Sequence, residues 1–227
     1  MNIGGHLKSS FIDYPDKIST VFFTRGCNFR CPYCHNSALV LGTEENVEMD
    51  YIEQFLRERK KYLDGIVVSG GEPTIQQDLP DFLSWLQAFG LPVKLDTNGS
   101  NPRMLEVLLK KGLVDYVAMD IKAPLAKVGN LAGVMVSLSD VRSSIDLLMQ
   151  GETDYEFRTT VAKELLSLED LYALALEIQG AKRYVLQRFR DNEEVLAGPG
   201  LFSAYTLEEM RQLQERIDPY LEQVLLR

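Results

Sequence analysis

Ser19-Thr-Val-Phe-Phe-Thr-Arg-Gly-Cys-Asn-Phe-Arg-Cys-Pro-Tyr-Cys-His-Asn36 joins a strand-like run directly to all three cysteines of the chain. The run Ser19–Thr24 is rich in β-branched and aromatic residues, which predicts a buried strand. Cys27, Cys31 and Cys34 follow with the spacing C-x₃-C-x₂-C. Thiolates favour iron–sulfur clusters, zinc and copper(I) as ligands. The stretch therefore predicts a ligand-bearing loop at the carboxyl end of the first strand of the core.

Three thiolates on one short loop favour an iron–sulfur cluster with one open iron. A [4Fe–4S] cluster is usually held by four thiolates, so three would leave one iron free for a small chelating ligand. Zinc bound by Cys₃His is the main alternative. It would need His6, or His35, whose side chain follows Cys34 directly and would tend to point away. Buried packing of the cysteines is a third interpretation, but it does not explain why all of them fall within an eight-residue window.

Composition limits the classes of partner and the compartment. The chain has 227 residues, 45% of them hydrophobic, and a formal charge of 24 − 33 = −9. A surface of this charge repels phosphate backbones, so we expect no nucleic-acid partner. The start, MNIGGHLKSS, lacks the apolar run of a signal peptide, and no apolar stretch reaches membrane-spanning length. We therefore expect no membrane association and a cytoplasmic location, where thiols stay reduced.

Outward from the cysteine loop, hydrophobic periodicity predicts strands alternating with helices. Residues 1–18 are interpreted as a polar lead-in, and residues 123–133 as an irregular loop. Gly112 is a predicted helix C-cap, and Thr206 with Glu209 a predicted capping box. The predicted strands are 19–24, 65–69, 93–97, 116–122, 155–161 and 183–189. The predicted helices are 49–62, 79–89, 102–111, 141–149, 168–178 and a closing helix, 206–226.

This alternation predicts an α/β fold with a parallel sheet and right-handed crossovers. Six units are too few for an eight-stranded barrel, so we expect a single domain, 1–227, folded as an open, partial (β/α)₆ TIM-like barrel. Ligands bind at the carboxyl ends of the strands in such folds. The motifs Gly70–Pro73, Asp96–Gly99 and Asp120–Lys122 all lie at predicted strand ends, as the cysteine loop does. The sequence therefore predicts one shared site at the open mouth of the barrel.

With these motifs in place, the chain resembles the radical S-adenosylmethionine superfamily. The three cysteines match its cluster motif, and Gly70-Gly71-Glu72-Pro73 matches its second motif. Cys34-His35-Asn36 and Asp120-Ile121-Lys122 look like the glycyl-radical-enzyme activases within it. Ser10-Phe-Ile-Asp-Tyr-Pro15, together with Thr24–Asn36, is most similar to anaerobic ribonucleoside-triphosphate reductase activating proteins. Asp16 departs from that pattern, in which glycine follows the Tyr-Pro pair.

The resemblance implies a specific cofactor chemistry. A [4Fe–4S] cluster held by Cys27, Cys31 and Cys34 would chelate S-adenosylmethionine through its open iron. One electron from the reduced cluster would break the carbon–sulfur bond, leaving methionine and a 5′-deoxyadenosyl radical. That radical would take the α-hydrogen of a glycine in a partner glycyl radical enzyme. Because no cysteine remains for a second cluster, electrons would come from a flavodoxin or a ferredoxin.

The resemblance also implies roles for residues outside the cluster motif. Glu72 and the backbone before it would receive the ammonium group of the cofactor, and Lys122 its carboxylate. Asp96, Thr97 and Asp120 are candidates for a monovalent cation site. Read without the resemblance, the Gly-Gly-Glu-Pro motif is an ordinary turn, and Asp120 with Lys122 is an ordinary salt bridge. The full predicted set for cofactor binding is Tyr33, His35, Gly70, Gly71, Glu72, Pro73, Asp96, Thr97, Asn98, Asp120, Lys122, Arg158 and Gln187.

Two other functions remain open at this point. One is a radical enzyme that acts on a small molecule, which would need a lid over its substrate. The short chain leaves little sequence for such a lid. The other is a zinc-stabilised binding module, which metal analysis would separate from an enzyme: iron with labile sulfide indicates the enzyme, and one zinc without sulfide indicates the module.

Overall fold

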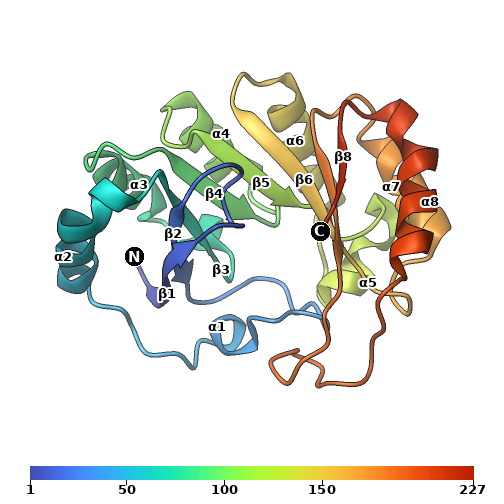
Figure 1. The fold of residues 1–227 in the computed structure, drawn as a ribbon, viewed down its shortest axis with the longest axis horizontal. Helices are drawn as coiled ribbons and strands as arrows, with labels where there is room; N and C mark the ends of the chain where they lie inside the picture. The colour runs from blue at the N-terminus through green and yellow to red at the C-terminus, as the bar shows by residue number, and fades with distance from the viewer. The chain divides into compact units, whose positions relative to one another are not determined.

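The computed structural model describes residues 1–227, which form an α/β fold with a mostly parallel sheet (Figure 1). The sheet has eight strands, ordered as they occur in the chain. The strands are β1 (Ile3–Ser10), β2 (Ser19–Thr24), β3 (Gly65–Gly70), β4 (Val93–Thr97), β5 (Tyr116–Asp120), β6 (Asp154–Val161), β7 (Tyr184–Arg188) and β8 (Val224–Leu226). The α-helices are α1 (Ser37–Leu41), α2 (Met49–Arg59), α3 (Leu79–Gln87), α4 (Pro102–Lys110), α5 (Val128–Ala132), α6 (Leu138–Gln150), α7 (Leu168–Glu177) and α8 (Leu207–Ile217).

The chain divides into two compact units. The first comprises residues 1–28, 38–97 and 103–117, and the second residues 29–37, 98–102 and 118–227. The boundary runs through the cysteine loop, so that Cys27 belongs to the first unit and Cys31 and Cys34 to the second. The expectation that residues 1–227 form one domain stays a prediction.

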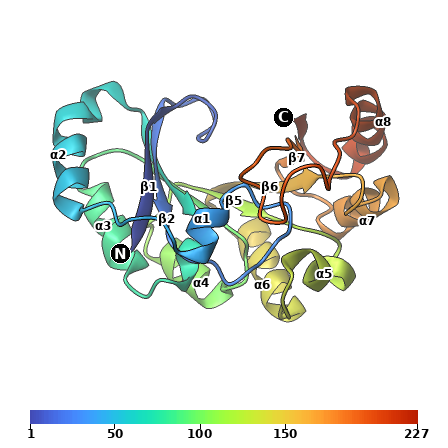
Figure 2. The same ribbon diagram turned by 90° about the horizontal axis from the view of Figure 1, so that it is seen from below.

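The first unit contains strands β1 to β4. β1 pairs antiparallel with β2, with Leu7 opposite Val21. β2 and β3 pair in parallel, as do β3 and β4, so that Val67 on β3 lies opposite Val21 on one side and Lys94 on the other. Val21 and Val67 belong to a buried apolar cluster with Tyr14 and Tyr116. Figures 1 and 2 show α2 and α3 on the same side of these strands.

The second unit contains strands β6 to β8, which pair in parallel. Tyr184 of β7 lies opposite Phe157 on β6 and Val224 on β8, and both aromatic side chains are fully buried. α7 and α8 pack against each other (Figure 1). α8 begins with the predicted capping box, in which Thr206 and Glu209 bond each other's backbone N–H groups. That sequence prediction is confirmed.

The six predicted strands correspond to β2–β7, with small differences at their ends. The lead-in prediction is wrong, because residues 3–10 form an edge strand whose Gly-rich, half-exposed sequence shows no apolar alternation. The closing helix was predicted nine residues too long and ends at Ile217. Pro219 explains this, because it has no backbone N–H to continue the helical hydrogen bonds, although Asp218 before it still has helical backbone angles. The chain then continues through a 3-10 turn into β8.

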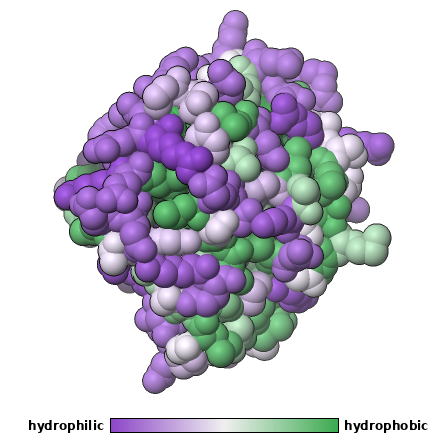
Figure 3. All heavy atoms as spheres, turned by 90° about the vertical axis from the view of Figure 1, so that its right-hand side faces the viewer, coloured by the Kyte–Doolittle hydropathy of each residue, from purple (hydrophilic) through white to green (hydrophobic).

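The face shown in Figure 3, the right-hand side of Figure 1, is covered largely by hydrophilic side chains, with apolar ones in separate groups among them. Among the exposed apolar residues of the second unit are Leu176 on α7 and Leu207 on α8. No helix combines the length and the apolar character that crossing a bilayer requires.

Candidate functional site

The Gly-Gly-Glu-Pro turn is built against the start of the cysteine loop, within the first unit. The Gly71 N–H donates to the Thr24 carbonyl and the Glu72 N–H to the Gly26 carbonyl, each at 2.9 Å. A Cβ on Gly71 would lie only 1.9 Å from the Gly26 carbonyl oxygen. Gly70 has φ +117°, a conformation that residues with a side chain rarely adopt. Both glycines are therefore required for the backbone that leads into Cys27.

The carboxylate of Glu72 lies at the centre of this turn and is buried. Its Oε1 accepts from the Thr74 N–H at 3.0 Å and from the Thr97 hydroxyl at 2.7 Å. Pro73 begins the short 3-10 turn that follows. The hydrogen bond to Thr97 links the turn to the end of β4. Glu72 is therefore fixed in orientation by two strand ends, as a residue that positions a ligand must be.

Asp96, the residue before Thr97 on β4, is paired with Lys94, which is not among the predicted site residues. Lys94 has no exposed surface, and its ammonium contacts Asp96 Oδ1. Asp96 Oδ2 accepts from the Ser69 hydroxyl at 3.0 Å. Residues two apart on a strand share a face, so the pair follows from the strand geometry. The carboxylate that was a candidate cation ligand therefore already faces a protein cation.

In the second unit, Tyr33 of the cysteine loop packs beside Lys122. The Lys122 ammonium lies 5.9 Å from the centroid of the Tyr33 ring. Tyr33 is buried, and its hydroxyl has no hydrogen-bond partner in the protein. Buried polar atoms rarely lack a partner, so this hydroxyl is suited to one that a bound molecule provides. Burial raises the pKa of the Cys31 thiol, and the Lys122 ammonium offsets part of that rise.

Asp120 and Lys122, at the end of β5, form a charged cluster with Arg158 from the middle of β6. Asp120 accepts from the Arg158 Nε at 2.8 Å and from the Lys122 ammonium at 3.0 Å. Burial alone would raise the pKa of Asp120, but Arg158 and Lys122 outweigh it and bring that pKa down to about 2. The salt bridge of Asp120 with Lys122, which was the interpretation made without the resemblance, is thus present, and Asp120 is also the polar partner that Arg158 needs within a strand. Two cations around one carboxylate leave net positive charge, which suits an anionic ligand group.

Two further predicted residues, Asn98 and Gln187, lie at or near strand ends. Asn98 is buried, and its side-chain oxygen accepts from the Ser100 N–H at 2.9 Å, which shapes the turn after β4. Gln187 lies on β7 opposite Thr160 of β6 and is half-buried. Their predicted roles in cofactor binding, like those of the other residues in the set, stay predictions.

The donor set fits a cluster better than a single ion. All three cysteines are free, with Cys31 buried and the other two partly exposed. Zinc would need a fourth protein donor beside three thiolates, whereas a [4Fe–4S] cluster with three protein ligands keeps one iron open for a bound molecule. The three thiols and the unpartnered Tyr33 hydroxyl are the features that match the predicted cluster and its ligand.

Both histidines that zinc would need are engaged elsewhere. His6 contacts the Tyr51 hydroxyl through Nδ1 at 3.1 Å and the Thr20 hydroxyl through Nε2 at 2.8 Å. Burial, with a smaller contribution from Lys8, lowers the pKa of His6 to about 4, so its ring is neutral at pH 7. The ring of His35 contacts the Arg190 carbonyl through Nε2. His6 is thus held through both ring nitrogens, whereas the contact of His35 uses Nε2, and a metal-binding histidine commonly donates its other ring N–H to a backbone carbonyl.

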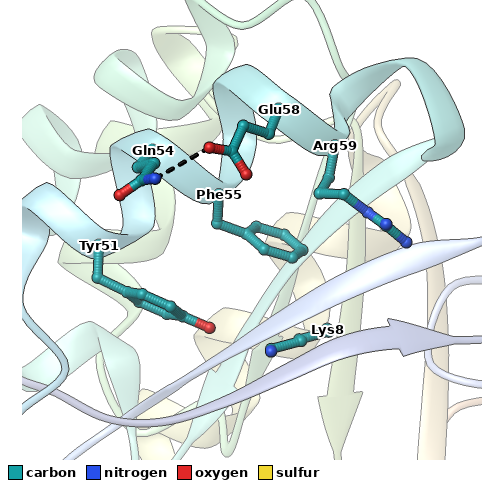
Figure 4. A pocket seen from close by; sticks show the side chains of 6 residues that line it. All are labelled: Lys8, Tyr51, Gln54, Phe55, Glu58 and Arg59. Atoms are coloured by element: carbon teal, nitrogen blue, oxygen red, sulfur yellow. Dashed lines mark hydrogen bonds between the residues drawn. The ribbon is translucent and has the colours of Figure 1, made fainter.

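A surface hollow of about 360 Å³ lies beside His6, between β1 and α2 (Figure 4). In Figure 4, the Tyr51 ring and the Lys8 side chain border the space beneath α2, and Gln54 is joined to Glu58. Phe55, 8% exposed, forms its apolar wall. None of the residues that line it belongs to the cysteine loop or to the other predicted motifs. The lining residues are Lys8, Tyr51, Gln54, Phe55, Glu58 and Arg59.

Comparison with known proteins assigns the chain to a family. Residues 21–164 match the Radical SAM superfamily. The chain is 31% identical, over 99% of its length and 95% of the relative's, to a Methanocaldococcus jannaschii protein provisionally named a glycyl-radical enzyme activating enzyme. It is 36% identical to the pyruvate formate-lyase-activating enzyme of Clostridium pasteurianum, over 46% of each chain.

A solved structure supports the fold. SuiB of Streptococcus suis, solved with S-adenosylmethionine bound, superposes with a TM-score of 0.69 at 17% identity, over 91% of this chain and 49% of SuiB. The likeness extends beyond the matched residues 21–164 and agrees with the α/β architecture described above. The cysteine motif, the glycine-rich turn packed on it and these matches lead to one conclusion: the chain belongs to the radical SAM superfamily.

Proposed function

We propose that this protein is an activating enzyme that cleaves S-adenosylmethionine reductively and removes the α-hydrogen of a glycine in a partner glycyl radical enzyme. The observation that carries the proposal is the packing of the Gly70–Pro73 turn on the start of the cysteine loop, through the Gly26 and Thr24 carbonyls. It joins the Gly-Gly-Glu-Pro motif to the start of the cysteine motif, within the first unit of the fold. The relative that matches over 99% of the chain is provisionally named for the same activity.

Membership of the superfamily implies a [4Fe–4S] cluster and S-adenosylmethionine, and three cysteines are present to hold the cluster. When bound, the reduced cluster supplies the electron that breaks the carbon–sulfur bond of the nucleoside and yields a 5′-deoxyadenosyl radical. In the proposal, Cys27, Cys31 and Cys34 hold three irons, and Glu72 receives the cofactor ammonium. Lys122 binds its carboxylate, and Tyr33 packs near its adenine.

The proposed partner is anaerobic ribonucleoside-triphosphate reductase, with a flavodoxin or ferredoxin as the reductant. The stretch Ser10–Pro15 and the run Thr24–Asn36 support this choice. Identity to a pyruvate formate-lyase-activating enzyme makes pyruvate formate-lyase the second partner to test. A monovalent cation beside Asp96 is not part of the proposal, because Lys94 already supplies positive charge there.

Electron paramagnetic resonance tests the activity. The anaerobically reconstituted protein is incubated with reductant, S-adenosylmethionine and each candidate partner, alongside partners whose radical glycine is replaced by alanine. A glycyl doublet with the intact reductase alone supports the proposal in full. A doublet with pyruvate formate-lyase alone would show that pyruvate formate-lyase, and not the reductase, is the partner. Normal cleavage of S-adenosylmethionine without a doublet from any partner would reject activation in favour of a small-molecule substrate.

A matched pair of lysine variants tests cofactor binding separately. Lys122→Met removes a partly buried ammonium that faces Tyr33, whereas Lys127→Met removes a half-exposed one that pairs with Asp170. A charge-assisted hydrogen bond contributes about 1.5–3 kcal/mol, so we expect Lys122→Met to weaken S-adenosylmethionine binding roughly 10- to 100-fold. Lys127→Met should leave it unchanged. Equal affinities for the two variants, measured by calorimetry, would remove Lys122 from the proposed site.

A further inference from the structure

The connection between β7 and α8, residues 189–206, returns to the cysteine loop within the second unit. The Ala197 N–H donates to the Pro32 carbonyl and the Leu196 N–H to the Cys34 carbonyl, each at 2.9 Å. Two backbone hydrogen bonds therefore fix the segment that carries Cys31 and Cys34 to a part of the chain more than 160 residues away.

His35 adds a side-chain contact between the same two segments. Its Nε2 donates to the Arg190 carbonyl, because a carbonyl oxygen can only accept. Its ring also packs on Phe189, with centroids 5.4 Å apart, and Phe189 in turn meets Phe202 edge-on at 5.9 Å. The residue after the third cysteine is thus held by a hydrogen bond and by aromatic packing.

The β7–α8 connection is itself braced, although it contains no regular secondary structure. The Gly200 N–H donates to Asp191 at 2.8 Å, and the Gly198 N–H to the Val195 carbonyl at 2.8 Å. Near its end, Ser203 donates to Glu164 through both its N–H, at 2.7 Å, and its hydroxyl, at 2.6 Å. A braced segment can hold another one in place, whereas a freely moving one cannot.

We infer that the β7–α8 connection is the positioning element for the cluster-binding segment, with His35 as its side-chain anchor and the Leu196 and Ala197 amides as its backbone anchors. His35 then serves the cofactor indirectly, by fixing the backbone between Cys31 and Cys34. The inference rests on the cluster that superfamily membership implies and not on the identity of the partner enzyme. It assigns a task to a histidine that the sequence analysis grouped with the cofactor-binding residues.

Two pairs of variants test this inference. His35→Ala removes the anchor, and His35→Gln keeps an N–H donor on a side chain of similar reach. Ala197→Pro removes the backbone donor to Pro32, and Ala197→Ser keeps it. Thermal unfolding of all four proteins checks that each is folded.

The first measurement is hydrogen–deuterium exchange of the cluster-free chain, which depends on neither cluster nor substrate. We expect His35→Ala and Ala197→Pro to exchange about fivefold faster in peptides covering residues 29–37 and 189–202, the factor that one net hydrogen bond confers. His35→Gln and Ala197→Ser should stay near wild type. Unchanged exchange in these peptides, or an increase spread equally over both units, would overturn the inference.

The second measurement follows iron release from the anaerobically reconstituted protein to the chelator ferrozine. His35→Ala and Ala197→Pro should lose iron at least about fivefold faster than wild type, with His35→Gln restoring slow release. The electron paramagnetic resonance line shape of the reduced cluster should broaden in the two disrupting variants and not in the two conservative ones. Equal iron release and line shape in all four variants would show that the connection does not position the cluster-binding segment.

Discussion

Replacing Gly71 with alanine should have two effects at once: it should destabilise the protein and displace Cys27, the first of the three cysteines. The added Cβ would lie 1.9 Å from the Gly26 carbonyl oxygen and 3.3 Å from the Cys27 nitrogen. An unstrained carbon–oxygen contact is roughly 3.3 Å, so the backbone must move by about 1.4 Å. Because the obstacle is main chain and not a flexible side-chain end, the movement has to be shared between the glycine-rich turn and the cysteine loop.

The expected cost follows from the contacts that this movement breaks. Overpacking against a rigid neighbour costs about 1–3 kcal/mol. The movement also strains the hydrogen bonds from the Gly71 and Glu72 N–H groups to the Thr24 and Gly26 carbonyls, each worth about 1 kcal/mol. We therefore expect Gly71→Ala to lower the free energy of unfolding by about 3–5 kcal/mol, a large share of the roughly 5–15 kcal/mol of a typical domain.

Urea unfolding and iron content measure the two effects, with Gly129→Ala as the matched control. Gly129 lies in α5 with ordinary backbone angles, and the nearest atom that its added Cβ would meet outside this helix is the Val134 carbonyl oxygen, at 3.6 Å. That substitution should be neutral or stabilise the protein by up to about 1 kcal/mol. An unchanged urea midpoint together with full iron content in Gly71→Ala would refute the claim that the turn is packed on the cysteine loop.

Three further predictions concern individual contacts. Because the pKa of Asp120 is about 2 in the folded chain against an ordinary value of 3.8, its carboxylate stabilises the protein above pH 4, and this contribution disappears as the pH falls through 2. Asp120→Asn should therefore cost about 2 kcal/mol at pH 7 and progressively less below pH 4, as followed by thermal unfolding across that range. Lys94→Met should cost about 3 kcal/mol by leaving Asp96 poorly compensated, and Asp96→Asn should restore part of it in a double-mutant cycle of urea unfolding. Thr206→Ala should cost about 1 kcal/mol through loss of the α8 cap, which thermal unfolding would detect unless that cap is dispensable.

The sequence alone predicted what depends on local pattern. Strands β2–β7 carry apolar or β-branched runs, and each polar motif follows its strand directly, so the strand ends and the motifs beside them were visible without a structure. The capping box at Thr206 needs only two residues three apart. Lys94 was visible in principle too, because it lies two residues before Asp96 in a buried strand, and a lysine there requires an acidic partner.

The missed features depend on contacts between distant segments. β1 and β8 are edge strands whose sequences carry little pattern, and their pairing is set by the neighbour that they join. The contact of His35 with Arg190 spans 155 residues and uses a backbone carbonyl as its acceptor. A carbonyl belongs to every residue type, so no pattern of side chains around Arg190 marks it as a partner.

The use of backbone groups, which every residue type has, also explains why so few side chains identify a site of this kind. The cysteine loop is held at its start by the Gly71 and Glu72 amides and at its end by the Leu196 and Ala197 amides, all of them main-chain donors to main-chain acceptors. Main-chain bonds restrict the side chain only where a Cβ would collide, as at Gly71, or where φ is positive, as at Gly70. The sequence requirement of the motif is therefore reduced to its three thiols and to the glycines that let another segment approach them. Among the intervening residues, Phe29 is buried, whereas Asn28 and Arg30 are exposed.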